Sequence, residues 1–147
     1  ISGAIACADV LGIFGRYGVG LATYWALHDN ESFAYAALRV YRNYDGQGAA
    51  FGDIALNATS SDKENVSVYG SLDAAHTDRV VAVVINKATS TKTVGLRLAH
   101  PSAFAALSRY ELSGGNAQLT SKPDVAAKAD NAWVIMLPAQ SVTVLVP

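Results

Sequence analysis

The 147-residue chain has few of the residues that build reactive centres. It has one cysteine, Cys7, so it forms neither an internal disulfide nor a multi-cysteine metal site. Its three histidines, His28, His76 and His100, lie far apart and lack metal-binding spacing. The sequence contains no Gly-x-Ser-x-Gly elbow and no phosphate-binding loop. We therefore expect no metal and no cofactor, and we expect Cys7 to be a small buried side chain.

Charged residues are also scarce, at 16% of the chain, and the formal net charge is −1. The lysines and arginines are scattered, which argues against nucleic-acid binding. No apolar run approaches the length of about 18 residues that a membrane span needs. The first ten residues show neither an initiator methionine nor a signal peptide, so we expect the chain to begin inside a longer protein. Hydrophobic residues make up 51% of the chain, enough for the core of one domain.

The first 46 residues carry a helix–strand–helix pattern. Apolar residues recur at helical spacing over 2–15, with Ser2 as the candidate cap and Gly18 as part of the stop. Residues 19–25 are a short, nearly continuous apolar run, which predicts a strand covered on both faces. A second helical pattern covers 33–44. A single strand of this kind has no partner for its backbone, so we expect one unit of a larger α/β sheet or barrel, or an unusual packing on the rest.

From about residue 51 onward, the apolar period changes to two, which predicts strands. The expected strands are 66–69, 79–85, 94–98, 132–137 and 142–146. Spacers rich in turn residues separate them, at 57–62, 73–77, 88–92, 113–116 and 121–131. Short strands with such short connections are antiparallel neighbours, and their number favours a β-sandwich.

The residues at the end of the first predicted strand are the best candidates for a binding role. Trp25 ends the apolar run, where the active sites of barrels gather, and a flat indole there would stack on a sugar ring. Tyr24 lies beside it. The alternative is that Trp25 is a core residue covering the strand end, and the residues alone leave both open. Asp29 and Glu31 are weaker candidates for a substrate role, since they also fit a solvated loop. Trp133 is expected in the core of the β part.

Several stretches are similar to one enzyme family. The segments "ADVLGIFGRYGV" (8–19) and "YRNYDGQG" (41–48) resemble the family 44 glycoside hydrolases, which are bacterial endo-acting cellulases and xyloglucanases. The segments "SVYGSLD", "RVVAVVINK" and "LPAQSVTVLV" are also similar to theirs, although the last recurs in the sandwich tails of many glycosidases. The resemblance covers essentially the whole chain.

The resemblance implies a fold class. Family 44 enzymes combine a (β/α)8 barrel, or TIM barrel, with a β-sandwich beside it. Residues 1–46 would be the end of the barrel, with 2–15 its penultimate helix, 21–25 its eighth strand and 33–44 its last helix. Residues 47–147 would be the sandwich. The expected fold is therefore an α+β fragment, in which the last helix–strand–helix unit of a TIM barrel precedes an antiparallel β-sandwich.

The resemblance also implies a function. In the family, the general acid and the nucleophile are glutamates on earlier barrel strands, the nucleophile in a Thr-Glu-Tyr setting. The glutamates of this chain, Glu31, Glu64 and Glu111, lack those neighbours. The expectation is the C-terminal part of a secreted bacterial retaining endo-β-1,4-glucanase, inactive alone, in which Trp25 and Tyr24 contribute to substrate binding. Its partners would be a β-glucan and the missing N-terminal portion of the barrel.

Two alternatives stay open. A non-catalytic carbohydrate-binding module would present a row of exposed aromatic residues on one face of the sandwich. The β part offers only Phe51, Tyr69, Phe104, Tyr110 and Trp133, mostly in core-like contexts. A purely structural sandwich would support a barrel and bind nothing.

Overall fold

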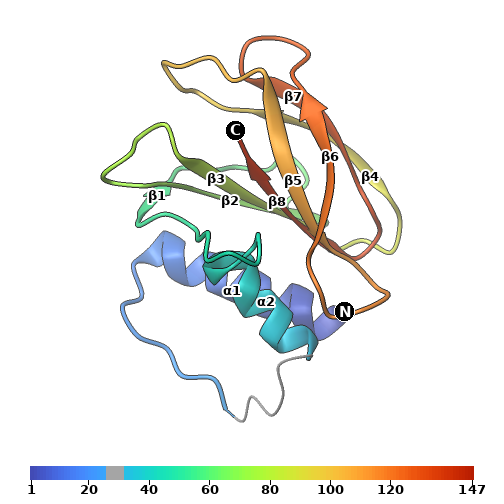
Figure 1. The fold of residues 1–147 in the computed structure, drawn as a ribbon. Helices are drawn as coiled ribbons and strands as arrows, with labels where there is room; N and C mark the ends of the chain where they lie inside the picture. Colours follow the sequence, from blue (N-terminus) through green and yellow to red (C-terminus); the bar gives the residue numbers. More distant parts are fainter. Residues whose placement is uncertain (26–31) are drawn as a thin grey trace.

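The computed structural model describes residues 1–25 and 32–147. In the described residues two helices precede a series of strands (Figure 1). The elements are α1 (Ser2–Tyr17), α2 (Phe33–Arg42), β1 (Ile54–Leu56), β2 (Val66–Leu72), β3 (Val80–Asn86), β4 (Lys92–Arg97), β5 (Ala106–Leu112), β6 (Thr120–Ala126), β7 (Ala132–Leu137) and β8 (Ser141–Val146). Within this part of the chain, neither helix has the length and apolar character needed to cross a bilayer.

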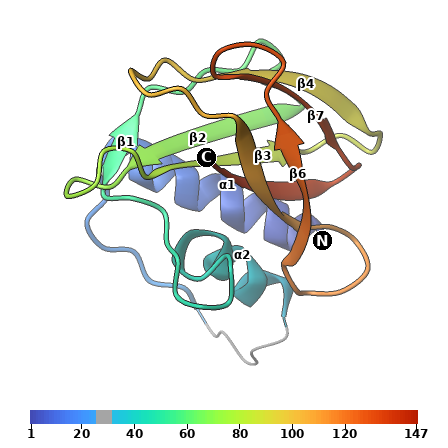
Figure 2. The ribbon, with the colours of Figure 1, turned by 45° about the horizontal axis from the view of Figure 1, so that its top comes forward.

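The elements form three layers. The middle layer is a six-stranded sheet in the order β1-β2-β3-β8-β5-β6. One of its faces is covered by a two-stranded sheet, β4-β7, and the other by both helices (Figures 1 and 2). All strand pairs are antiparallel. The expectation of antiparallel β-sheets accompanied by two helices is therefore confirmed.

The core between the two sheets shows the period of two that the sequence carries. Along β7, Trp133, Ile135 and Leu137 are buried, whereas Val134 and Met136 between them face solvent. The buried residues pack against side chains of the six-stranded sheet, which include Val66, Val84, Leu107 and Leu145. Trp133 is 1% exposed, so its expected place in the core is confirmed.

The core between the helices and the sheet is built from small helical residues. Ala4 and Ala8 of α1 and Ala36 and Ala37 of α2 are fully buried, which lets the two helices lie close to each other and to the sheet. The hydroxyl of Tyr41 on α2 donates a hydrogen bond to the carbonyl of Ala8, with an oxygen–oxygen distance of 2.8 Å. The helices are therefore part of one packed body with the sheet.

The ends of the helices differ in part from the expectation. Ser2 is not the cap of α1, because Ile1 occupies the N-cap position and no side chain caps the helix. The glycine stop is confirmed, since Gly18 takes a left-handed conformation with φ of 67°, which glycine adopts without strain. α2 ends at Arg42, two residues early, because the backbone N–H of Tyr44 bonds to Ala49 instead. The hydroxyl of Ser32 caps α2.

Strand prediction failed where the alternation of apolar residues was broken. The range 121–131, expected to be a spacer, contains most of β6. This strand lies at the edge of its sheet, and it is polar and includes Pro123, which only an edge strand accommodates. β5 was missed because Arg109 and Glu111 occupy positions that an apolar pattern would fill. β1 is only three residues long.

The strand predicted over 19–25 is not formed in this chain. Residues 19–25 have no regular structure and no strand partner among the described residues, and Leu21 is 86% exposed. A buried strand requires neighbours for its backbone N–H and C=O groups on at least one side. The described residues supply none for this segment, so its apolar character alone does not produce a strand.

Two glycines of α1 provide a test of the helix–sheet packing. Gly12 is buried, and a methyl group there would overlap the ring of Tyr69 on β2, whereas at Gly15 it would meet open space. We expect Gly12→Ala to lower the free energy of unfolding by about 1–3 kcal/mol through overpacking. Gly15→Ala should raise it by up to about 1 kcal/mol, because alanine favours the helix. Urea unfolding of both variants measures this. Equal effects of the two substitutions would show that α1 does not pack on Tyr69.

Candidate functional site

The two residues predicted to bind substrate lie together after α1. Trp25 is 94% exposed and Tyr24 is 55% exposed, at the end of the irregular segment that follows Gly18. In the described residues the indole of Trp25 is therefore on the surface. Asp29 and Glu31, the weaker candidates, lie outside the described residues, as does His28.

A shallow apolar groove adjoins Tyr24. It has a volume of about 390 Å³ and lies between α1 and residues 22–24, with Val10, Phe14 and Leu38 among its lining residues. Cys7 also lines it, and burial raises the pKa of the Cys7 thiol, so this cysteine is not an activated nucleophile. The described lining residues include no carboxylate and no histidine. The groove offers apolar contact area but no acid–base chemistry.

The described glutamates do not form a catalytic pair. Glu111 on β5 is 4% exposed and is held by the guanidinium of Arg109 and by the ammonium of Lys122. Its neighbours Tyr110 and Leu112 belong to the core under the helices, so Glu111 points to the opposite face of the sheet. Glu64 lies on an exposed turn before β2. Retaining glycoside hydrolysis needs two carboxyl groups about 5–5.5 Å apart, and Glu64 and Glu111 occupy unrelated places.

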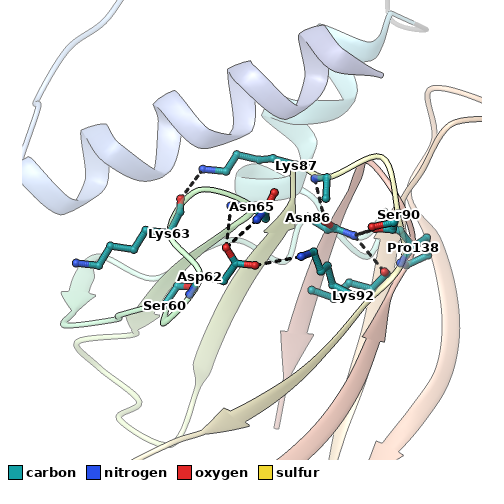
Figure 3. A network of polar contacts seen from close by, with 11 residues as sticks. Ser60, Asp62, Lys63, Asn65, Asn86, Lys87, Ser90, Lys92 and Pro138 are labelled. Atoms are coloured by element: carbon teal, nitrogen blue, oxygen red, sulfur yellow. Dashed lines mark hydrogen bonds and ion pairs between the residues drawn. The ribbon is translucent and has the colours of Figure 1, made fainter.

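A network of polar contacts joins three turns and stabilises the fold (Figure 3). The buried side-chain amide of Asn86 donates to the carbonyls of Ser90, Leu137 and Pro138, at 2.7–3.2 Å, which ties the turn after β3 to the turn before β8. Asp62 accepts from Asn65 and pairs with Lys92. These contacts lower the pKa of the Asp62 carboxyl, the hydrogen bond from Asn65 contributing most. Within the described ranges, no group of three or more His, Cys, Asp or Glu residues is placed to hold a metal ion.

The aromatic residues of the β part are packed inside. Phe51, Tyr69 and Tyr110 belong to the core under the helices, whereas Phe104 and Trp133 belong to the core between the sheets. The large exposed apolar side chains of the strands are Ile54, Val134 and Met136, and none of them is aromatic. Residues 47–147, all of them described, therefore present no aromatic row of the kind that a sugar-binding face uses.

Comparison with known proteins identifies relatives of the whole arrangement. No protein-family model matches the chain. Endoglucanase A of Paenibacillus lautus is 49% identical over 87 residues, which are 59% of this chain and 12% of that protein. Cel44A, a family 44 endoglucanase from Clostridium thermocellum, superposes with a TM-score of 0.92 at 30% identity, over 97% of this chain and 28% of that one. In sequence the chain is similar to part of an endoglucanase, and in fold it is similar to part of a family 44 endoglucanase.

A second family 44 enzyme is similar in fold over the same part of the chain. The xyloglucanase from Paenibacillus polymyxa superposes with a TM-score of 0.90 at 30% identity, over 97% of this chain and 28% of its own. Since both superpositions include the helices and the sheets, the packing of α1 and α2 on the six-stranded sheet is shared with these family 44 proteins. The chain spans little more than a quarter of the length of these two solved proteins.

The hydrogen bond between Tyr69 and Asp9, which joins β2 to α1, makes the packing of α1 on the sheet pH-dependent. The Tyr69 hydroxyl donates to Asp9 at 2.6 Å, and burial together with this carboxylate raises the pKa of Tyr69 above its ordinary value. The unfolded tyrosine ionises near pH 10 while the folded one stays protonated, so folding stability should fall as the pH rises above about 10.

Substitution isolates this contribution. Tyr69→Phe should cost about 1–2 kcal/mol at neutral pH, because Asp9 loses a buried donor, and should make the alkaline loss of stability shallower. Urea unfolding between pH 7 and 11 measures both effects. Tyr17→Phe, at an exposed position of α1, the helix that carries Asp9, is the matched control and should change neither. An unchanged alkaline slope in Tyr69→Phe would contradict the assignment.

Proposed function

We propose that the chain is the C-terminal part of a secreted, retaining bacterial endo-β-1,4-glucanase that acts on cellulose or xyloglucan. Residues 1–46 are then the terminal part of its barrel and residues 47–147 its β-sandwich. The observation that carries the proposal is the superposition of nearly the whole chain on family 44 endoglucanase and xyloglucanase structures. Secretion follows from the substrate class, since β-glucan polymers lie outside the cell.

The exposed apolar surface of α1 supports a larger parent. Val10, Ile13 and Tyr17 lie at helical spacing on α1 and are exposed, although the helix buries its other side against the sheet. Leu21 and Trp25 continue this surface along the chain. Contiguous exposed apolar groups mark surfaces that other parts of a protein cover. In the proposal the rest of the barrel covers the exposed side of α1 and Leu21, whereas Trp25 stays open at the rim of the cleft. Residues 21–25 become the eighth strand once neighbouring strands supply hydrogen bonds.

The proposed mechanism assigns the chemistry to residues outside this chain. Retaining hydrolysis uses one glutamate as nucleophile and another as general acid and base. Neither described glutamate fits these roles. Glu111 is buried and paired with the side chains of Arg109 and Lys122, and Glu64 lies on an exposed turn away from it. At the carboxyl end of the eighth strand, Trp25 would form the floor under one glucose ring, and Tyr24 would lie beside it. This chain therefore binds substrate and supports the barrel.

The first test of the proposal concerns the chain alone. A purified protein of residues 1–147 should release no reducing sugar from carboxymethylcellulose or xyloglucan above a blank, because the acid and the nucleophile are absent. The parent protein, expressed from its full open reading frame, should hydrolyse at least one of these polymers. Hydrolysis by residues 1–147 would refute the assignment of both catalytic glutamates to residues outside this chain. An inactive parent would refute the proposed function.

The second test concerns Trp25 in the parent enzyme. Trp25→Ala should lower kcat/KM on the preferred β-glucan by about tenfold, which corresponds to about 1.4 kcal/mol of lost stacking. Met136→Ala removes an exposed apolar side chain from the outer face of the two-stranded sheet and should leave kcat/KM unchanged. Equal kinetics in both variants would show that Trp25 does not touch the substrate.

A further inference from the structure

The loop that leads from α2 to β1 borders a polar pocket, here called the loop pocket (Figure 2). Residues 48–53 form one wall, and residues of the turn 73–79 between β2 and β3 form the other, together with Phe104. Its volume is about 600 Å³, which is within the range of small-molecule sites. It has no lining residue in common with the groove beside Tyr24. The loop pocket is therefore separate from the site that contains the proposed substrate-binding residues.

The two walls of the loop pocket are fixed to the sheet and to each other. The backbone at Gly52 approaches β2 so closely that a methyl group there would overlap the carbonyl of Leu72. The N–H of Gly52 donates to the hydroxyl of Ser71 at 2.8 Å. The N–H of Ala74 in the facing turn donates to the carboxylate of Asp53, also at 2.8 Å. The pocket is therefore preformed, as ligand sites usually are.

Charged groups of both signs line the loop pocket. Asp53 on one wall and Asp78 and Arg79 on the other are all exposed. The carboxylate of Asp78 makes no hydrogen bond or ion pair with the described residues. Arg79 pairs with Asp73 through one guanidinium nitrogen at 3.3 Å, so its other N–H groups remain available. The pocket thus offers both acceptors and donors to a ligand.

The hydroxyl of Tyr44 has no partner at the same place. Tyr44 is 7% exposed and lines the loop pocket, and its hydroxyl makes no hydrogen bond with the described residues. Burial raises the pKa of Tyr44, and the guanidinium of Arg79 partly offsets this rise, so the two groups lie near each other. A buried tyrosine hydroxyl normally finds a hydrogen-bond partner. A ligand hydroxyl in the pocket would supply one.

This mixture of groups favours a neutral ligand with many hydroxyls. Three carboxylates repel an anion, and the guanidinium of Arg79 repels an organic cation. The described part of the chain places no group of three or more His, Cys, Asp or Glu residues to hold a metal ion. Sugar hydroxyls can donate to the carboxylates and accept from Arg79. The half-buried ring of Phe104, packed on His100 at 5.0 Å between ring centroids, adds an apolar surface for a sugar ring.

We propose that the loop pocket binds a short segment of β-glucan, at a second site separate from the cleft that contains Trp25. The inference rests on the proposed function, which supplies β-glucan as the polymer. Binding at a second site would keep the polymer close to the barrel between cleavage events and so raise its local concentration. No row of exposed aromatic residues is needed, because the preformed polar groups of the pocket provide the recognition.

Titration of residues 1–147 with cellotetraose, followed by backbone amide signals in NMR spectra, tests the proposal. The amides of 48–53 and 73–79 should shift and reach saturation. Asp78→Ala removes an acceptor and Tyr44→Phe removes only the hydroxyl, so each should raise Kd by about threefold to tenfold, as expected for one hydrogen bond. Asp124→Ala is the matched control, because it removes an exposed carboxylate from β6 outside the pocket and should leave Kd unchanged.

Three results would overturn the second site. The first is the absence of saturable shifts at 48–53 and 73–79, including the case in which cellotetraose shifts only 22–25. The second is an equal affinity for maltotetraose, because the pocket would then accept any glucose polymer and not specifically a β-linked one. The third is a shift of these amides by calcium chloride but not by cellotetraose, because the pocket would then be a cation site.

The variants and the parent enzyme separate the remaining outcomes. An equal rise of Kd in Asp124→Ala and Asp78→Ala would contradict a local role of the loop pocket. Hydrolysis of β-glucan is measured on the parent, whereas binding is measured on residues 1–147. An active parent whose residues 1–147 bind no cellotetraose in the pocket therefore rejects the second site but not the proposed function.

Discussion

The structure depends on a sheet whose two faces are both apolar and must both be kept from water. β3 and β8 lie at its centre, and nearly all their residues are buried, because side chains on one face meet the helices and those on the other meet the two-stranded sheet. Apolar burial contributes about 25 cal/mol per Å², so neither cover can be removed without a large loss of stability. The two helices are therefore as much a part of the sandwich as its strands.

This constraint also explains where the candidate site lies. Because α1 uses one side to cover the sheet, its opposite side, with Val10 and Ile13, faces outward together with the segment that carries Trp25. The same helix thus connects a scaffold on one side with a proposed barrel on the other. The hydrogen bond from Tyr69 to Asp9 and the close approach of Tyr69 to Gly12 fix the position of α1 on β2.

Prediction from sequence succeeded where a segment's own pattern was sufficient. The alternation in β7 and the helical spacing in α2 each report which side is buried, so those elements and the core position of Trp133 were found. It failed for β6, whose polar residues pair only because β5 lies beside them. It failed also for the strand predicted over 19–25, whose apolar run needs neighbours that the described residues do not supply. The exposure of Trp25 was left open, since composition does not reveal which surfaces meet.

By itself the sequence determined the spacing of apolar residues in the helices and strands and the glycine stop after α1. It also determined the lack of a metal-binding spacing and the similarity to family 44. Each of these is a property of residues that are neighbours in the chain. Only the tertiary structure decided that Glu111 is held by Arg109, that Tyr69 is buried under α1, and that β4 pairs with β7 alone among the described strands. These depend on contacts between residues far apart in sequence. Such contacts form when the burial of both partners outweighs the entropy of bringing them together.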